Sequence, residues 1–392
     1  MQTGFGQICI NPTQPTEAAG FIQQRNVKLT DVHDDLYARI LGVRDDSTTL
    51  FLVSLDNLGT PYRLEEELTR QYAQETGEQA VVQISCTHDH FAANVEDEDY
   101  YRLLKERILI GCKELVWHMS DLRLSRRHIY FDEVGHSRIT GHKAKNIYLD
   151  LVCFYDGDLP LGTAIIYNCH PTILSGFTPY FSGEYPGYVL RRLQERYPAE
   201  FFTFFQGAAG DISTRFTRTR QDYEGVVALG DKLVKKIVEL KEAPMETHAV
   251  SLRYEKRILP LEHEYKDLDE MPIPPGISAR EKAEIDVAKR IRKEALQHPE
   301  RLERQLVFSK VDFGFLNMIF TPKEMFSAYM DALDLSRSIL VGYTNGYSPY
   351  IVELGHKELT YEMCLDTTKE TTKERFYELL HELSTESLPS CL

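Results

Sequence analysis

The sequence lacks the features that would place it in a membrane or send it into a secretory pathway. It contains no uninterrupted run of about 18 apolar residues, the length that a membrane-spanning helix needs. Its first residues, Met1 to Gly6, have neither the basic start nor the apolar stretch of a signal peptide. From these absences we predict a cytoplasmic protein without a transmembrane segment.

Positive charge is also scarce. The chain has 45 Lys and Arg against 60 Asp and Glu, which gives a formal net charge of -15. A surface of this sign repels nucleic-acid backbones and anionic lipid headgroups, and no Lys/Arg run offsets it. The sequence therefore argues against nucleic acid as a partner and favours a small-molecule substrate, while homo-oligomer formation stays open.

The seven cysteines are scattered and form no C-x-x-C pair. An odd, unpaired set of this kind is typical of free thiols in a reducing compartment. Cys86 and Cys169 each lie close before a histidine, which raises a catalytic or metal-binding role for them. Both also end apolar runs, where a buried thiol behaves as a small hydrophobe, so we expect both to be packing residues.

The pattern of apolar and polar residues along the chain indicates an α/β fold. The chain is 42% apolar, with β-rich runs mixed with amphipathic helical stretches. We predict a single domain, 1–392, built as a layered mixed β-sheet with flanking helices and an active site at the strand ends. The predicted strands cover 37–43, 49–55, 80–86, 149–155, 163–169, 201–205, 311–320 and 338–343, and the predicted helices cover 63–75, 99–119 and 223–240.

The stretch 278–305 stands apart, because it is rich in Ala, Glu, Lys and Arg and has little strand character. It predicts a charged helical excursion from the body, with Ser278 and Glu281 as a capping box. A lid, an interaction arm and a solvated connector all fit this pattern. Further along, Pro322 is predicted to open a helix, at the first position that proline favours.

Histidines follow two of the predicted strands. His88 and His90 form an H-x-H pattern, and in an extended segment alternate side chains point the same way, so both rings can reach one ion. His170 leaves a third strand just before Pro171, which stiffens the backbone there. Two close histidines also occur by chance on loops, so the pattern alone leaves the metal site open.

The small-residue turn 207–211 follows another strand. It has no G-K-[ST] ending and no G-x-G-x-x-G spacing, which argues against a nucleotide site. Small residues here let the backbone pass close to a ligand, and Asp211 and Ser213 are the predicted substrate-binding groups. Ser213 is not in a G-x-S-x-G elbow, so a serine hydrolase is disfavoured.

Taken in order, these clusters resemble motifs of the neutral, non-lysosomal ceramidases, a family of zinc-dependent amide hydrolases. The resemblance covers most of residues 1–370. Its pieces are the segments Gly4 to Asn11, Val53 to Asp56, Thr87 to His90, Asn168 to Thr172, Gln206 to Ser213, Thr321 to Glu324, Thr344 to Ile351, and Tyr361 with Glu362.

The resemblance implies one zinc ion held by two histidines, a glutamate and a tyrosine. These ligands map onto His88, His170, Glu324 and Tyr361 of this sequence. Nitrogen and oxygen donors suit a catalytic zinc, which also keeps one position open for water. A tyrosine ligand is unusual, because its phenol has an unperturbed pKa near ~10.

The resemblance also implies catalytic roles for three more residues. His90 stays off the metal and stabilises the oxyanion or protonates the leaving amine, Arg138 points at the reacting carbonyl, and Tyr350 donates a hydrogen bond to the oxyanion. The residues after His90, Phe91 to Asn94, differ from the family's Ser/Gly/Pro-rich loop. The chain also ends before the family's C-terminal immunoglobulin-like domain, so ceramide itself does not follow as the substrate.

The sequence thus predicts a zinc-dependent hydrolase that cleaves the amide bond of an N-acyl substrate with a metal-activated water. Two alternatives stay open. One is a metal-dependent esterase or deacylase that acts on a small polar substrate through the same site. The other is a non-catalytic family member that binds a metal or a ligand without turning it over.

Overall fold

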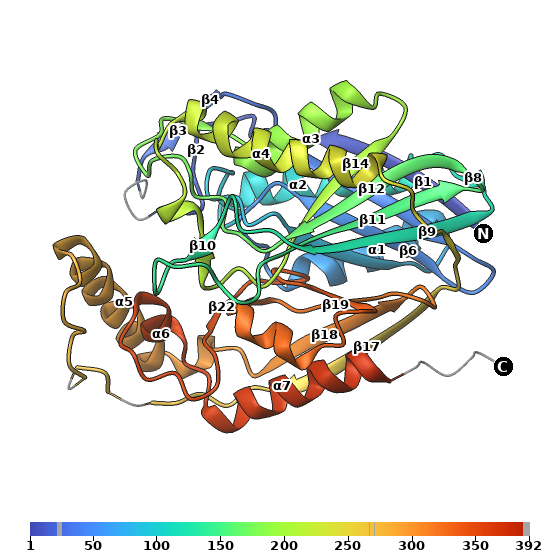
Figure 1. Cartoon of the computed structure of the whole chain (residues 1–392). Helices are drawn as coiled ribbons and strands as arrows, with labels where there is room; N and C mark the ends of the chain where they lie inside the picture. The colour runs from blue at the N-terminus through green and yellow to red at the C-terminus, as the bar shows by residue number, and fades with distance from the viewer. Residues whose placement is uncertain (22–25, 266, 270, 387–392) are drawn as a thin grey trace.

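The computed structural model describes residues 1–21, 26–265, 267–269 and 271–386, and it confirms a layered α/β fold (Figure 1). Two five-stranded sheets and one four-stranded sheet form the body. The first sheet has the order β7-β6-β5-β1-β8, with β1 Gln2–Cys9, β5 Tyr37–Arg44, β6 Thr49–Leu55, β7 Val81–Cys86 and β8 His118–Met119. The second has the order β14-β12-β11-β9-β16, with β9 Leu122–Tyr130, β11 Tyr148–Asp156, β12 Leu159–Tyr167, β14 Phe201–Gln206 and β16 His248–Ala249.

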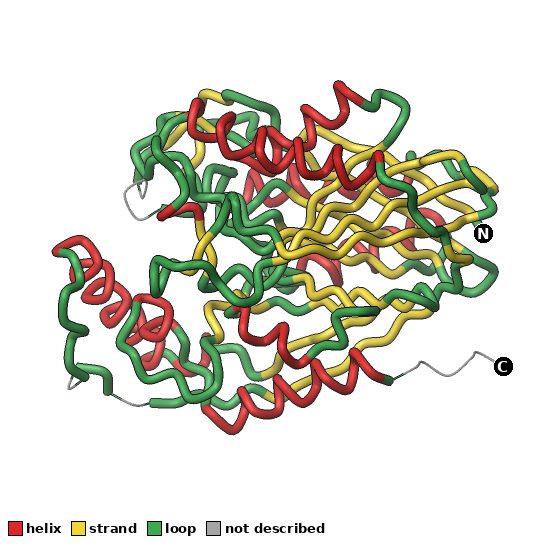
Figure 2. The backbone as a smooth tube through the Cα atoms, viewed as in Figure 1, coloured by secondary structure: helices red, strands yellow, loops and turns green. Residues whose placement is uncertain are grey.

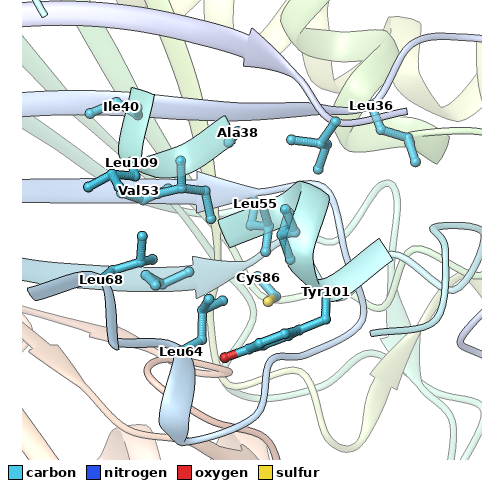
Figure 3. Close-up of a cluster of buried hydrophobic side chains, with 14 of the residues drawn as sticks. Leu36, Ala38, Ile40, Val53, Leu55, Leu64, Leu68, Cys86, Tyr101 and Leu109 are labelled. Carbon is cyan, nitrogen blue, oxygen red and sulfur yellow. The ribbon is translucent and has the colours of Figure 1, made fainter. Parts of the chain in front are cut away.

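The first sheet is apolar on both faces. Successive side chains of a strand point to opposite faces, so in β6 Phe51 and Val53 face one way while Leu50 and Leu52 face the other. The first pair packs in a core with helices α1 (Arg63–Thr76) and α2 (Glu98–Lys113), part of which Figure 3 shows. The second pair packs between sheets. Burial on both faces explains the continuous apolar run of this strand.

The second sheet repeats this arrangement. In β12, Ile165 packs under helices α3 (Glu184–Arg196) and α4 (Tyr223–Glu242), which lie over this sheet at the top of Figure 1. Its neighbours Ala164 and Ile166 join the core between the sheets. The alternation therefore produces helix, sheet, sheet and helix layers in that order.

The third sheet has the order β17-β18-β19-β21 and completes the body. Its strands are β17 Arg253–Pro260, β18 Gln305–Asp312, β19 Asn317–Phe320 and β21 Ser338–Val341. Met318 and Val341 pack against the first two sheets, whereas Phe308 packs on the other face with Phe376 of α7 (Glu370–Thr385). This sheet holds in place the short strand β20 (Lys323–Met325) that follows β19.

Short elements and loops surround one end of the layers, at the left of Figure 2. Strands β6 and β7 are parallel, and so are β12 and β14, so the carboxyl ends within each pair emerge at one edge. The residues that follow these strands contain every predicted histidine. The short strands here are β2 Thr16–Glu17, β3 Lys28–Leu29, β4 Asp31–Val32, β10 His136–Ser137, β13 Tyr180–Phe181, β15 Ile212–Ser213, β20 and β22 Ser348–Ile351.

The charged excursion forms helix α5 (Ala279–Gln297), with the predicted capping box between Ser278 and Glu281. The helix ends before the predicted limit of 305, where β18 already begins. It packs beside α6 (Tyr361–Leu365) at the lower left of Figure 1. Only a narrow apolar stripe of the helix, which includes Ile285 and Ala288, is buried in a small core. The rest of its surface is largely charged, as predicted.

Three sequence predictions about secondary structure were wrong. Pro322 opens no helix: residues 323–325 form β20, which pairs in parallel with β22, and this tertiary pairing overrides the local preference of proline. Helix α2 ends at Lys113 rather than 119, because residues 118–119 pair with β1. The single strand predicted over 311–320 is two strands, β18 and β19, joined by a turn.

Six cysteines lie in the described residues and all are free thiols, whereas Cys391 lies outside them. Cys86 and Cys169 are completely buried in the two helix-covered cores, and burial raises the pKa of both thiols. The prediction that they are packing residues is confirmed. None of the helices formed by the described residues combines the length and apolar character that crossing a bilayer requires.

Candidate metal centre

His88 lies two residues beyond strand β7, in a left-handed backbone conformation with φ 62°. The turn is held to the neighbouring strand end, since the Asp89 N–H donates to the Asn57 carbonyl at 3.0 Å. The Nδ1 of His88 lies 2.9 Å from the Leu58 carbonyl oxygen. The side chain is 1% exposed, so a ring oriented in this way has little freedom to turn.

His170 follows strand β12 and is completely buried. Its backbone forms a bridge to Ser213 of β15, and this bridge fixes the segment after the strand. The Nδ1 of His170 lies 2.6 Å from the Ala209 carbonyl and 3.1 Å from the Ile212 carbonyl. The small-residue turn after β14 therefore serves as the anchor of this imidazole, which explains why small residues are needed there.

His90 follows the same pattern. Its Nδ1 lies 3.0 Å from the Gly20 carbonyl, and its ring packs against Phe21 at 5.0 Å between centroids. Its Nε2 is buried and has no hydrogen-bond partner within the described residues. When Nδ1–H donates to a backbone carbonyl, the tautomer is fixed and Nε2 carries the lone pair, which is the arrangement found behind metal-binding histidines.

The three imidazoles converge. One ring nitrogen from each of His88, His90 and His170 lies within 4.8 Å of the others. The ring centroids of His88 and His170 are 4.8 Å apart, so the convergence expected from the sequence is present. Three nitrogen donors, each fixed from behind and one of them an orphaned buried atom, fit a divalent metal such as zinc.

Glu324 comes to this cluster from strand β20 and is completely buried. Its Oε1 lies 2.7 Å from the Nε2 of His170 and 3.5 Å from the Nε2 of His88. Burial alone would raise the pKa of this carboxyl, but the two histidines outweigh burial and hold the pKa well below its usual range. Glu324 is therefore an anion at neutral pH and adds an oxygen donor to the three nitrogens.

Two of the imidazoles, those of His170 and His90, are uncharged near neutral pH. Burial, followed by Arg138, lowers the pKa of His170 to about 4. Burial, followed by the two other histidines, lowers the pKa of His90 well below its ordinary value. Neutral imidazole is the form that binds metals and accepts protons, so both functions are available without prior deprotonation.

Arg138 lies on the other side of Glu324. Its Nη2 is 3.8 Å from the Glu324 Oε1, and its Nε is 2.8 Å from the Glu362 Oε1 on α6. The guanidinium also lies over the ring of Tyr350, 5.1 Å from the centroid. Burial opposes the charge, but Tyr350 and the two glutamates outweigh it and raise the pKa of Arg138 well above its usual value. A largely buried cation, with 12% of its side chain exposed, thus faces the cluster.

Two tyrosines lie near Glu324. Tyr350 on β22 is its register partner across the β20–β22 pair and is 6% exposed. Tyr361 begins α6 and packs edge to face against Tyr350, with centroids 6.1 Å apart. Burial, followed by Glu324, raises the pKa of Tyr361 to about 12. The Tyr361 hydroxyl makes no hydrogen bond to any described residue, so its role as fourth ligand stays a prediction.

Asp211 and Ser213 lie on the far side of the turn that anchors His170. Both Asp211 oxygens accept hydrogen bonds from Ser327, one from the N–H at 2.6 Å and one from the hydroxyl at 2.8 Å. The Ser213 hydroxyl accepts from the Arg215 N–H at 3.3 Å. These contacts hold the turn together, and the substrate-binding roles of the two residues stay predictions.

Sequence reasoning assigned no role to two residues that contact the cluster. Tyr343 stacks on the ring of His88, with centroids 4.1 Å apart. The hydroxyl of Tyr347 donates to the Glu324 Oε2 at 2.7 Å. Tyr347 belongs to the segment 344–351, and Tyr343 precedes this segment by one residue. The family resemblance included the segment but gave a role only to Tyr350 in it.

Comparisons with known proteins identify structures with a similar fold. No protein-family model matches the sequence, and a sequence search of curated proteins finds no match. The structure is similar to that of a neutral ceramidase from Pseudomonas aeruginosa, with a TM-score of 0.75 and 14% identity over 98% of this chain and 74% of that chain. A structure described as a ceramidase complexed with C2 matches with the same values. The fold expected from the ordered motifs is therefore confirmed: this chain has the fold of the neutral ceramidases.

Proposed function

We propose that the protein is a metal-dependent hydrolase, with zinc as the metal, that cleaves the amide bond of an N-acyl substrate. The observation that carries this proposal is the set of three converging imidazoles, each with Nδ1 on a backbone carbonyl, two of which, His170 and His88, face the Glu324 carboxylate. The shared fold with a neutral ceramidase supports the amide class. Ceramide itself is left aside, because the identity to that enzyme is 14%.

His88, His170 and Glu324 are the proposed protein ligands, with Tyr361 as the fourth. Its neighbour Tyr350 is proposed to donate a hydrogen bond to the oxyanion. A divalent ion held there supplies Lewis acidity and, in favourable zinc sites, lowers the pKa of a water to roughly 7. The protein's part is to hold the donors in place before the ion arrives.

His90 and Arg138 perform the remaining chemistry in this proposal. The neutral Nε2 of His90 accepts the proton of the attacking water and returns it to the leaving amine. Arg138 stays protonated and donates to the carbonyl oxygen as negative charge builds there. Because a backbone carbonyl holds His90 and an ion pair holds Arg138, both groups need little reorganisation during the reaction.

Several wider predictions remain part of the proposal. We propose that residues 1–392 act as one domain and that the protein works in the cytoplasm. Its proposed partner is a small N-acyl compound. The esterase and non-catalytic alternatives are outcomes of the test that follows.

The test has two parts. Elemental analysis of purified protein should find about one zinc per chain, and a panel of N-acyl amines matched with acyl esters should show which bond is cleaved. The paired substitution His88→Ala with His170→Ala should remove both the metal and the activity. Metal without turnover on the whole panel would favour the binding protein, and ester cleavage alone would favour the esterase. Full turnover by metal-free protein would contradict the proposal.

A further inference from the structure

The two oxygens of Glu324 have different partners. Oε1 faces the imidazoles of His170 and His88, at 2.7 and 3.5 Å. Oε2 accepts the hydrogen bond of the Tyr347 hydroxyl at 2.7 Å. A carboxylate without other hydrogen-bond partners can bind a metal through one oxygen or both. Here a phenol occupies the second oxygen.

The segment that carries Tyr347 has an unusual backbone. Tyr343, Asn345 and Gly346 have φ values of 54°, 53° and 140°. A left-handed conformation is unfavourable for a residue other than glycine, so the fold must compensate for two such residues within one turn. Directly after this turn, Tyr347 reaches Glu324.

Asn345 provides that compensation. Its side-chain oxygen accepts from the Ile84 N–H at 2.8 Å, and its amide donates to the Gln83 side chain at 2.8 Å. Its own N–H donates to the Ile84 carbonyl, also at 2.8 Å. The turn is thus fixed to strand β7, the strand that leads into His88.

Gly59 packs closely against the side chain of Tyr347. A Cβ placed on Gly59 would lie 2.5 Å from the Tyr347 Cβ and 2.6 Å from its ring. On the other side of the turn, a Cβ on Gly346 would lie 2.4 Å from the ring of Tyr62. The contact with Gly59 limits movement of the Tyr347 side chain, and the contact with Tyr62 limits movement of the turn at Gly346.

We propose that Tyr347 is a positioning residue which, by binding Oε2, restricts Glu324 to coordination of the metal through Oε1 alone. A catalytic zinc keeps one coordination position for water, and a bidentate carboxylate would fill it. This inference rests on the proposed function, because it assigns Tyr347 a part in the same site. Tyr347 acts through Glu324 and touches no substrate atom in this scheme.

The chain offers a matched control. Tyr188 on α3 donates to the carboxylate of Asp231 on α4, also at 2.7 Å, in the helix layer over the second sheet. Tyr347→Phe and Tyr188→Phe therefore remove the same kind of hydrogen bond. Only the first bond ends on a proposed metal ligand.

The experiment loads both variants and the parent protein with Co²⁺, whose visible absorption reports coordination number, and measures zinc affinity by chelator competition. For Tyr347→Phe we expect a changed cobalt spectrum and a kcat reduced at least about tenfold with KM unchanged, in the range typical for an outer-shell partner. Tyr188→Phe should match the parent in all of these.

A parental spectrum and kcat in Tyr347→Phe would overturn this inference and leave the proposed function intact. A parent protein that binds no Co²⁺ and cleaves no substrate would overturn both. If Tyr347→Phe does not fold, Gly59→Ala tests the same contact, because the added methyl displaces the tyrosine while its hydroxyl is kept. It should change the cobalt spectrum in the same direction, and an unchanged spectrum in a folded Gly59→Ala would contradict the inference.

Discussion

The histidine cluster and helix α5 show two ways in which this chain uses charged and polar groups. In the cluster, His88, His170 and Glu324 are at most 1% exposed, and backbone carbonyls fix both imidazoles. On α5, Glu284 and Glu281 are about a third exposed and pair with Arg215 at 3.4 and 3.8 Å. One region is held by buried hydrogen bonds and the other by solvated ion pairs.

This difference indicates where function depends on geometry. Buried polar groups lose several kcal/mol of hydration, so a fold keeps them only when every partner is in place. Exposed ion pairs contribute about 0–1 kcal/mol and can be exchanged with little loss. We therefore expect substitutions in the cluster to abolish activity, and substitutions on α5 to alter it only slightly.

The largest effect is expected from Glu324→Gln. The amide keeps the shape of the side chain but removes the negative charge that faces both imidazoles. Metal content, measured by elemental analysis, should fall to background, and hydrolysis should fall to the level of metal-free protein. A variant that kept its metal and most of its activity would remove Glu324 from the ligand set.

His90→Ala should separate acid–base chemistry from metal binding. In our proposal the variant keeps its metal and loses about 10²–10⁴ in kcat, the range for a positioned proton carrier. The measurement is metal content together with kcat on the same sample. Loss of the metal would instead make His90 a third imidazole ligand, in line with its place within 4.8 Å of the other two.

Glu184→Gln should reveal a pH dependence of stability outside the cluster. The buried Glu184 carboxylate accepts from the N–H groups of Ile173, Leu174 and Tyr185, and so holds the loop after His170. Burial raises the pKa of Glu184 from 4.5 to about 7. A raised pKa in the folded state gives stability that is complete below pH 4.5 and is lost as the pH rises through 7.

We therefore compare the free energy of unfolding of the parent with that of Glu184→Gln. The parent's advantage over the variant should decrease by up to about 3 kcal/mol as the pH rises from 4.5 to about 7. Denaturant titrations of metal-free protein at several pH values measure this difference. Glu195→Gln, on the exposed side of the same helix, is the control and should show no such slope. An equal slope in both variants would contradict the assignment.

The smallest effect is expected from Glu284→Gln on α5. It removes ion pairs with Arg215 and with Arg280, at 3.4 and 2.9 Å, whose partners are partly exposed. We expect a stability change within about 0.5 kcal/mol that disappears at high salt. Thermal unfolding at low and high ionic strength checks this. A loss of stability as large as that expected for a buried ion pair would contradict the difference proposed between the cluster and α5.

The sequence predicted those site residues that directly follow a strand. An H-x-H after one strand and a lone histidine after another point to His88 and His170, because polar groups after neighbouring strands meet at one edge of a sheet. Glu324 came only from the resemblance, and its predicted helix was wrong. A three-residue strand that exists through its pairing with β22 leaves no periodicity to detect.

Tyr347 escaped prediction for a different reason. Its contact with Glu324 depends on a left-handed turn whose strain is offset by Asn345 and by strand β7, far away in the sequence. No local pattern encodes such a compensation. The start of helix α5 was predicted well, because its capping box and its composition are local signals.

Anomalous diffraction from crystals of the protein loaded with zinc is the most direct test of the central claim. We predict one strong anomalous-difference peak about 2.0–2.2 Å from the Nε2 atoms of His88 and His170 and from the Glu324 Oε1. A structure without a peak there at saturating zinc, with the two imidazoles still hydrogen-bonded to their backbone carbonyls, would contradict it.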